Sequence, residues 1–231
     1  MNAFALPKAS RLHVSADADA LAAACAARIA ELIAATLAQR AHCRIALAGG
    51  ETPRRCYAVL RALPVDWGRV QVYFGDERCL PVGDAQRNDT MAQDSLLQHV
   101  ALPATHLHAI PAELGAEEAA VRYSEWLAQA GTLDLVLLGL GEDGHTASLF
   151  PGNPALQRAE PAVAVFDAPK PPPQRISMSL ATLNAARHKL FLVAGSGKRD
   201  ALQRIARGEA LPAAGVKDAE WFLDKAAVPV S

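Results

Sequence analysis

The amino-acid sequence predicts an α/β fold: an open, mostly parallel Rossmann-like sheet with helices on both faces, in a single domain over residues 1–231. Short apolar runs alternate with segments of helical pattern, the arrangement that forms parallel sheets. Several of these runs end in glycine, as strands do before they turn into a helix. The 231 residues are 51% hydrophobic, which is enough for one large core, and no linker interrupts them.

The first elements show this pattern most clearly. Residues 18–39 are rich in Ala and Leu and polar on one side, which predicts an amphipathic helix. Residues 44–48 form a short apolar run that ends at Gly49–Gly50, which predicts a buried strand and a glycine turn. Pro53 then suits the first turn of a helix that extends to about residue 63.

The remaining elements continue the alternation, with right-handed crossovers between parallel strands. Further strands are expected at 70–74, 106–110, 133–138, 163–166, 175–178, 189–194 and 220–223. Further helices are expected at 90–100, 116–129 and 198–207. The proline-rich segment 161–173 is expected to be mostly loop. Polar motifs therefore fall at the carboxyl ends of several strands, where open α/β sheets bind ligands.

The overall charge excludes one class of partner. Lys and Arg number 23 against 24 Asp and Glu, which gives a formal net charge of −1. Proteins that neutralise nucleic-acid phosphates are usually strongly basic, so we expect no nucleic-acid partner. A local cluster of Arg and Lys remains compatible with a small anionic substrate.

The N-terminus and the cysteines predict where the protein resides. The first residues lack the basic-then-apolar order of a signal peptide. The longest apolar stretch, 18–37, carries Asp19, Arg28 and Glu31, so we expect a surface helix and not a membrane span. The four cysteines are Cys25, Cys43, Cys56 and Cys79. They lack C-x-x-C spacing, which predicts reduced, mostly buried thiols in a cytoplasmic protein with no membrane partner.

Two glycine turns are candidate anion sites. The turn at Gly49–Gly50 exposes backbone N–H groups beside a helix N-terminus, and Thr52 adds a hydroxyl donor. A plain tight turn explains this motif equally well when it is taken alone. Gly195 leads to Lys198 at the start of another helix, and Arg175 lies on the preceding strand. Lys198 and Arg175 together suit a phosphate, although either alone is more often a solvated cation.

Three charged residues, Asp76, Glu77 and Arg78, directly follow the apolar strand 70–74. Charges at such a place are costly unless they face a cleft or one another. We interpret Asp76 and Arg78 as functional, since Arg78 offers a planar fork of donors for an oxyanion or phosphate. For Glu77 we favour a solvated loop position with local ion pairing.

The glycine-rich segment 139–152 contains the best candidate for a catalytic base, His145. A lone histidine is usually structural, but this one lies in a polar turn at the end of an apolar strand. A short helix starting here would disfavour the imidazolium at its N-terminus, leaving His145 neutral near pH 7 and able to accept a proton. Asp143 is expected to orient the ring by accepting its other N–H. The other histidines are interpreted as surface or core residues.

Together these motifs resemble the 6-phosphogluconolactonase family, in the right order over nearly the whole chain. The most specific block is Gly139-x-Gly141-x-Asp143-Gly144-His145-Thr146-Ala147-Ser148-Leu149-Phe150-Pro151. The other matching motifs are Gly49-Gly50-x-Thr52-Pro53, Asp76-Glu77-Arg78 with Pro81 and Asn88, Arg175, and Gly195 with Lys198. The resemblance implies the fold of the amino-sugar phosphate deaminases and hydrolysis of 6-phospho-D-glucono-1,5-lactone in the pentose phosphate pathway. It also implies no cofactor, no metal, and a functional link to glucose-6-phosphate dehydrogenase.

The hypothesis that follows from this resemblance is general-base hydrolysis. His145 takes a proton from water as it attacks the lactone carbonyl, and Asp143 holds the imidazole. Arg78 or a backbone N–H stabilises the oxyanion, while Asp76 binds a sugar hydroxyl or Arg78. Protonated His145 then returns its proton to the ring oxygen. The groups expected to hold the phosphate are Thr52, Arg175, Lys198 and the amides of Gly49 and Gly50.

Glu51 departs from the family, which commonly has a small hydroxyl residue at that position. Its carboxylate would repel a phosphate, so we expect it to point away from the site. Two alternatives stay open. One is a sugar-phosphate deaminase or isomerase, although the deaminases place a glutamate five residues after the histidine, where this chain has Phe150. The other is a sensor without turnover, although regulators with this fold carry a DNA-binding module for which we see no spare length or basic segment.

Overall fold

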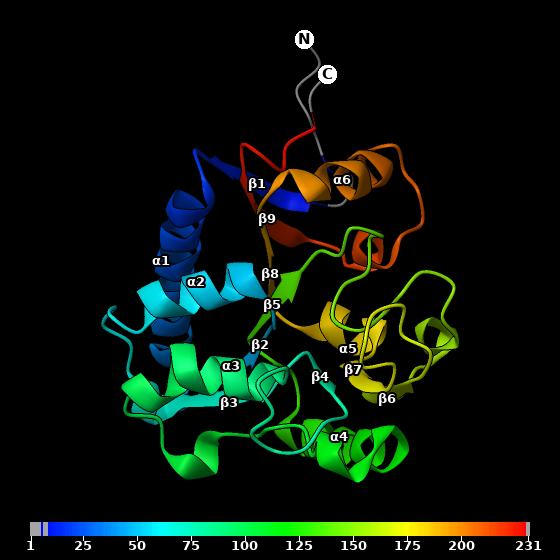
Figure 1. The fold of residues 1–231 in the computed structure, drawn as a ribbon. Coiled ribbons are helices and arrows are strands. Elements are labelled where there is room, and N and C mark those ends of the chain that lie inside the picture. The colour runs from blue at the N-terminus through cyan, green and yellow to red at the C-terminus, as the bar shows by residue number, and fades with distance from the viewer. Residues whose placement is uncertain (1–5, 7–8, 230–231) are drawn as a thin grey trace.

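The computed structural model describes residue 6 and residues 9–229, and Figure 1 shows how its elements are arranged. The strands of the main sheet are β1 (Ala9–Ser15), β2 (Cys43–Leu47), β3 (Val70–Phe74), β5 (Leu135–Gly139), β8 (His188–Val193) and β9 (Ala219–Asp224). They pair in the order β1-β9-β8-β5-β2-β3, and every pairing is parallel. The predicted α/β fold with a parallel sheet is therefore confirmed.

Helices cover both faces of this sheet. They are α1 (Ala18–Leu37), α2 (Glu51–Leu60), α3 (Asn88–Ser95), α4 (Ala116–Ala130), α5 (Leu180–Ala185) and α6 (Arg199–Ala206). Figure 1 shows α1 and α2 on one side of the sheet and α5 and α6 on the other. The strands between them are apolar on both faces, because a parallel sheet covered by helices exposes neither. Residues 135–138 of β5, for example, are each at most 1% exposed.

A second, antiparallel sheet was not predicted. It consists of β4 (Asp76–Arg78), β7 (Arg175–Met178) and β6 (Ala162–Val165), in the order β4-β7-β6. Only Gly75 separates strand β4 from β3, and the charged sequence of β4 contains no apolar run that would predict a strand. In the register of β4 and β7, Arg78 lies opposite Arg175. This sheet therefore brings two polar motifs together that are far apart in the sequence.

One expectation about a single element was wrong, and two elements were not predicted. The predicted strand at 106–110 is a turn of 3-10 helix followed by one isolated bridge, Val72 to Leu107. Pro103 and Pro111 enclose that segment and lack the N–H groups that a strand ladder needs. Strand β1 and the short helix α5 were not predicted, since neither has a strong apolar period.

Helix α1 is long and apolar enough, by length and composition, to cross a membrane. In the fold its apolar face packs into the core, and its residues Leu21, Cys25 and Ile29 are fully buried. Arg28 donates from Nη2 to Glu220 of β9 at 2.7 Å. A buried face and an ion pair to the sheet identify α1 as a core helix of this domain.

The expectation that the cysteines are unpaired and mostly buried is confirmed. All four thiols are free; Cys25, Cys43 and Cys56 are buried, and Cys79 is partly buried.

Candidate active site

A cavity of about 380 Å³ opens where β2, β3 and β5 end and the second sheet begins. Seven of the nine residues predicted for the site line it: Gly49, Gly50, Asp76, Arg78, His145, Arg175 and Lys198. The carboxyl ends of parallel strands meet at one edge of a sheet, which is why motifs distant in sequence converge here. We call this space the active-site cavity.

His145 and Asp143 form a hydrogen-bonded pair. The imidazole Nδ1 lies 2.6 Å from Oδ1 of Asp143, and the backbone N–H of His145 donates to the same oxygen at 3.1 Å. Asp143 itself lies outside the cavity lining and contacts it through the ring. The turn depends on Gly141, since a Cβ there would lie 2.0 Å from Nδ1 of His145. With Nδ1–H donated to the carboxylate, Nε2 is left as the acceptor.

The charge state of His145 is set mainly by burial. Burial lowers the pKa of His145, Asp143 and Asp76 raise it, Arg175 lowers it further, and the net shift is downward. The imidazole is therefore neutral near pH 7, as expected. The expected cause was wrong, because residues 141–150 form turns and not the start of a helix. Desolvation of the imidazolium takes the place of the helix N-terminus.

Asp76 is 7% exposed and held by two side chains. Ser148 Oγ donates to its Oδ2 at 2.6 Å, and Asn88 Nδ2 donates to its Oδ1 at 3.1 Å. The expected contact with Arg78 is not made in the described part of the chain, because Arg78 donates instead to the carbonyl of Gln86. Asp76 therefore presents a fixed carboxylate to the cavity.

Gly49 links the first two motifs. A Cβ at Gly49 would lie 1.8 Å from Oδ1 of Asn88, so only glycine permits this approach. Asn88 also donates from Nδ2 to the carbonyl of Asp76 at 2.9 Å. The glycine turn and β4 are thus packed together through a single amide side chain.

Glu77 corrects a prediction: its side chain is fully buried, not solvated. Its carboxylate accepts from the backbone N–H groups of Arg78, Asn88 and Asp89 at 2.7 to 2.8 Å. Burial raises the pKa of Glu77 to about 7, against the lowering effect of these hydrogen bonds. The side chain joins β4 to the first turn of α3, which the charged sequence did not reveal.

Arg175 and Lys198 are the two predicted cations that line the cavity together, and Arg175 lies beside β4, where Asp76 acts on it. Arg175 is 5% exposed and donates from Nε to the carbonyl of Pro172 and from Nη2 to that of Lys170, at 3.1 and 2.8 Å. No described residue accepts a hydrogen bond from its Nη1. Burial lowers the pKa of Lys198. A half-buried ammonium and a free guanidinium nitrogen are suited to bind an anion.

Two lining residues were missed by the sequence analysis. Lys170 and Glu142 both line the active-site cavity, and Lys170 Nζ lies 3.7 Å from Oε2 of Glu142. Lys170 lies between prolines in a segment interpreted as loop, and Glu142 was not separated from its motif. A charge within a run of prolines next to Arg175 was the available signal for Lys170.

Thr52 and Glu51 lie at the edge of the site. Thr52, the ninth predicted residue, is partly exposed on the first turn of α2 and lies outside the cavity lining. Glu51 pairs with Arg54 at 2.7 Å and with Arg55 at 3.1 Å on the exposed side of the helix. Glu51 therefore points away from the cavity, as expected, while Gly49 and Gly50 line it.

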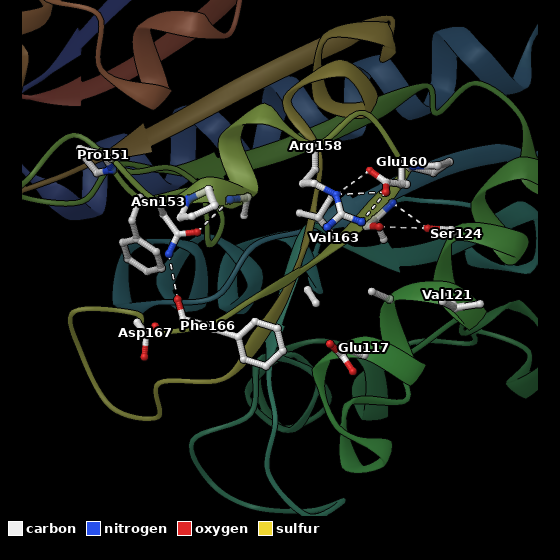
Figure 2. Close-up of a pocket in the computed structure, with 18 of the residues that line it drawn as sticks. Glu117, Val121, Ser124, Pro151, Asn153, Arg158, Glu160, Val163, Phe166 and Asp167 are labelled. Carbon is white, nitrogen blue, oxygen red and sulfur yellow. Dashed lines mark hydrogen bonds and ion pairs between the residues drawn. The ribbon is translucent and has the colours of Figure 1, made fainter.

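A larger space of about 1090 Å³ lies next to this cavity. Its walls include Glu117 and Val121 of α4 and, across from them, Phe166 and Asp167 (Figure 2). We call it the α4 hollow. Phe150 borders both spaces. The hollow is lined mainly by apolar side chains and carboxylates, so the smaller cavity is the better site for an anion.

The described residues contain no cluster of three or more His, Cys, Asp and Glu side chains that could hold a metal ion.

Residues 16–223 match the family model described as glucosamine-6-phosphate isomerases/6-phosphogluconolactonase. The chain belongs to this family. A 6-phosphogluconolactonase of Streptomyces coelicolor is 38% identical over 242 residues, covering 94% of this chain and 93% of that protein. The human 6-phosphogluconolactonase is 38% identical over 246 residues, covering 96% and 94%.

Solved structures in the glucosamine-6-phosphate isomerase/6-phosphogluconolactonase family have the same fold. The 6-phosphogluconolactonase of Thermotoga maritima superposes with a TM-score of 0.87 at 26% identity, covering 93% of this chain and 99% of that one. A monomeric glucosamine-6-phosphate deaminase superposes with a TM-score of 0.82 at 21% identity, covering 94% and 98%. The deaminase comparison supports the fold alone, so the choice between the two activities of the family depends on the site.

Proposed function

We propose that this chain hydrolyses 6-phospho-D-glucono-1,5-lactone to 6-phospho-D-gluconate, in the oxidative pentose phosphate pathway. The observation that carries the proposal is one cavity in which the neutral imidazole of His145, held by the Asp143 carboxylate, shares the lining with Arg175 and Lys198. The relatives named 6-phosphogluconolactonase support the same reaction. We assign the activity to one catalytic domain over residues 1–231.

The groups that bind the substrate phosphate also position the lactone ring. The imidazole centroid of His145 lies 4.5 Å from the Phe150 ring, and the guanidinium carbon of Arg175 lies 5.5 Å from the same ring. One sugar phosphate is long enough to reach both groups across Phe150. Lys198, Nη1 of Arg175 and the Gly49–Gly50 amides bind the phosphate, which holds the lactone carbonyl near His145.

The chemical step uses His145 as general base. Nε2 takes a proton from water as the water attacks the lactone carbonyl, and Asp143 stabilises the imidazolium that forms. Arg78 or a backbone N–H at the cavity wall stabilises the tetrahedral oxyanion, and such a donor contributes about 3 kcal/mol in known enzymes. Protonated His145 then gives its proton to the ring oxygen as the ring opens. Asp76 binds a sugar hydroxyl.

Phe150 favours hydrolysis over the deaminase alternative. A deaminase of this fold is expected to use a carboxylate at this position, and here an apolar ring stacks at a tilt on His145. Phenylalanine has no proton to transfer. Retention of His145, Asp143, Arg175 and Lys198 in one site also argues for turnover and against a sensor.

The proposal includes a setting for the enzyme. We propose that it acts in the cytoplasm on lactone released by glucose-6-phosphate dehydrogenase, without a nucleic-acid or membrane partner. An α/β domain with its long apolar helix packed into the core supports this setting.

The experiment that tests the function compares 6-phosphogluconolactone with unphosphorylated gluconolactone, each corrected for spontaneous hydrolysis. We expect kcat/KM to be at least roughly 10²-fold higher for the phosphorylated lactone, because the charged contacts are lost with the other. His145→Ala is expected to lower kcat/KM by roughly 10²–10⁴-fold. His99→Ala, on the exposed surface, is the control. Equal rates on both lactones, or full activity of His145→Ala, would contradict the proposal.

A further inference from the structure

A carboxylate, that of Glu142, lies beside Lys170 in the lining of the active-site cavity. Glu142 pairs with Lys170 at 3.7 Å, and both side chains are about two-thirds exposed, at 63% and 65%. A Cβ on Gly197 would lie 3.3 Å from Oε1 of Glu142, so the carboxylate also reaches the turn that carries Lys198. Glu142 therefore lies between the loop of Lys170 and the start of α6.

The charges around Glu142 interact with one another. The pKa of Lys198 is lowered by burial, raised by Glu142 and lowered by Lys170. The loop of Lys170 is fixed to Arg175, whose guanidinium donates hydrogen bonds to the carbonyls of Lys170, Pro171 and Pro172. Lys170, Arg175 and Lys198 all line the active-site cavity, and we call them the cation cluster. Glu142 pairs with Lys170 and acts on Lys198, whereas Asp76 is the main carboxylate that acts on Arg175.

We propose that Glu142 is a displaceable counter-ion of this cluster, and that Lys170 is a further phosphate ligand that Glu142 holds until the substrate arrives. The inference deepens the proposed function and rests on it. Before binding, Glu142 neutralises Lys170. When the phosphate enters, Lys170 turns to it and Glu142 is released to solvent; when the product leaves, Glu142 takes its place again.

The exposure of the pair makes this exchange feasible. Solvent-exposed ion pairs are weak, so a phosphate dianion, with twice the charge and three acceptor oxygens, displaces a carboxylate readily. A weaker or singly charged anion competes less well with Glu142. The carboxylate therefore lowers affinity for all anions but favours a doubly charged phosphate over the others, and it speeds product release.

The first test uses Glu142→Gln, which keeps the shape of the side chain and removes its charge. We expect KM for 6-phosphogluconolactone, and the Kd for 6-phosphogluconate and for inorganic phosphate by calorimetry, to fall about three- to fivefold. The change in KM for unphosphorylated gluconolactone should be smaller, because that substrate has no phosphate to compete with the carboxylate. Glu160→Gln is the matched control, since Glu160 also forms an exposed pair, with Arg158, but lines the α4 hollow.

Lys170→Met tests the other partner. It is expected to raise KM for the phosphorylated lactone without moving the acid limb of the pH profile appreciably, because the largest effects on the pKa of His145 come from burial, Asp143, Asp76 and Arg175. In the Lys170→Met background, Glu142→Gln should lose most of its effect. A full effect there, or equal behaviour of Glu142→Gln and Glu160→Gln, would overturn the inference.

Failure of the two proposals can be told apart. A wild-type chain that hydrolyses neither lactone refutes the proposed function, whereas the calorimetry with inorganic phosphate still measures the role of Glu142. A wild-type chain that prefers the phosphorylated lactone, with unchanged phosphate affinity in Glu142→Gln, refutes the inference alone.

Discussion

The chemistry of His145 depends on neighbours with opposing effects on its pKa. Asp143 fixes the ring through Nδ1 at 2.6 Å and favours the imidazolium, whereas burial against Phe150 and the charge of Arg175 disfavour it. Burial is the largest of these effects, so the pKa of His145 falls below its usual value of 6.5. A base with a depressed pKa is fully available at neutral pH and is lost only in acid.

The pH dependence of activity follows from the lowered pKa of His145. We expect kcat/KM to be constant near pH 7 and to fall below pH 6.5, as His145 becomes protonated. Asp143→Asn keeps a hydrogen-bond acceptor for Nδ1 but removes the charge that raises this pKa, so the acid limb should move to lower pH while kcat declines. The measurement is a pH–rate profile of both proteins. A shift of the limb to higher pH in Asp143→Asn would contradict the assignment.

Single residues show which parts of the site could be predicted from the sequence. His145 and Lys198 were found because each belongs to a glycine-rich turn after a strand, and Arg175 because it lies on a predicted strand and matches a family position. Glu77 was misjudged, since a charged residue after a strand is usually solvated and only the fold reveals the three N–H groups that surround it. Lys170 was missed because its place in the cavity depends on a loop held by Arg175.

At the scale of elements, β4 is the link between the two sheets. It continues from β3 and pairs with β7, and Glu77 joins it to α3. Apolar period and glycine turns predicted β3, β5 and α1 closely, because burial decides those elements. They did not predict β4, whose pairing depends on hydrogen bonds that no local pattern encodes.

Removal of the Glu77 carboxylate should weaken this link. Glu77→Ala leaves three backbone N–H groups without their acceptor in a buried site, so we expect a loss of about 3–5 kcal/mol in the free energy of unfolding. Urea unfolding measures it. The control is Glu118→Ala, which breaks an exposed pair with Arg122 and should cost at most about 0.5 kcal/mol. Similar losses in both variants would contradict the role of Glu77 as the link between β4 and α3.

At the scale of the whole molecule, the active-site cavity is shared by both sheets. Gly49 and His145 follow strands of the main sheet, and Asp76 and Arg175 belong to the second. A ligand that contacts both therefore joins the two sheets and stabilises the folded chain as a unit.

Thermal unfolding tests this coupling. At a concentration about 100 times its Kd, 6-phosphogluconate should stabilise the fold by about 2.7 kcal/mol. For a chain of this size that corresponds to a rise in Tm of roughly 5–10 °C. Gluconate without the phosphate should produce little shift, and Arg175→Met should lose most of the shift with 6-phosphogluconate. An undiminished shift in Arg175→Met would show that Arg175 does not bind the phosphate.

The register of β4 and β7 has a consequence for redesign. Arg78 and Arg175 are directly opposed in an antiparallel ladder, so their spacing is set by main-chain geometry and is insensitive to side-chain changes nearby. Deleting one residue from either strand would turn its alternate side chains to the other face instead of shortening the gap. An enzyme redesigned to accept a shorter or longer phosphorylated lactone would therefore need a different length of the loop at 166–173. That loop is the part of the cavity wall whose position the strand register does not fix.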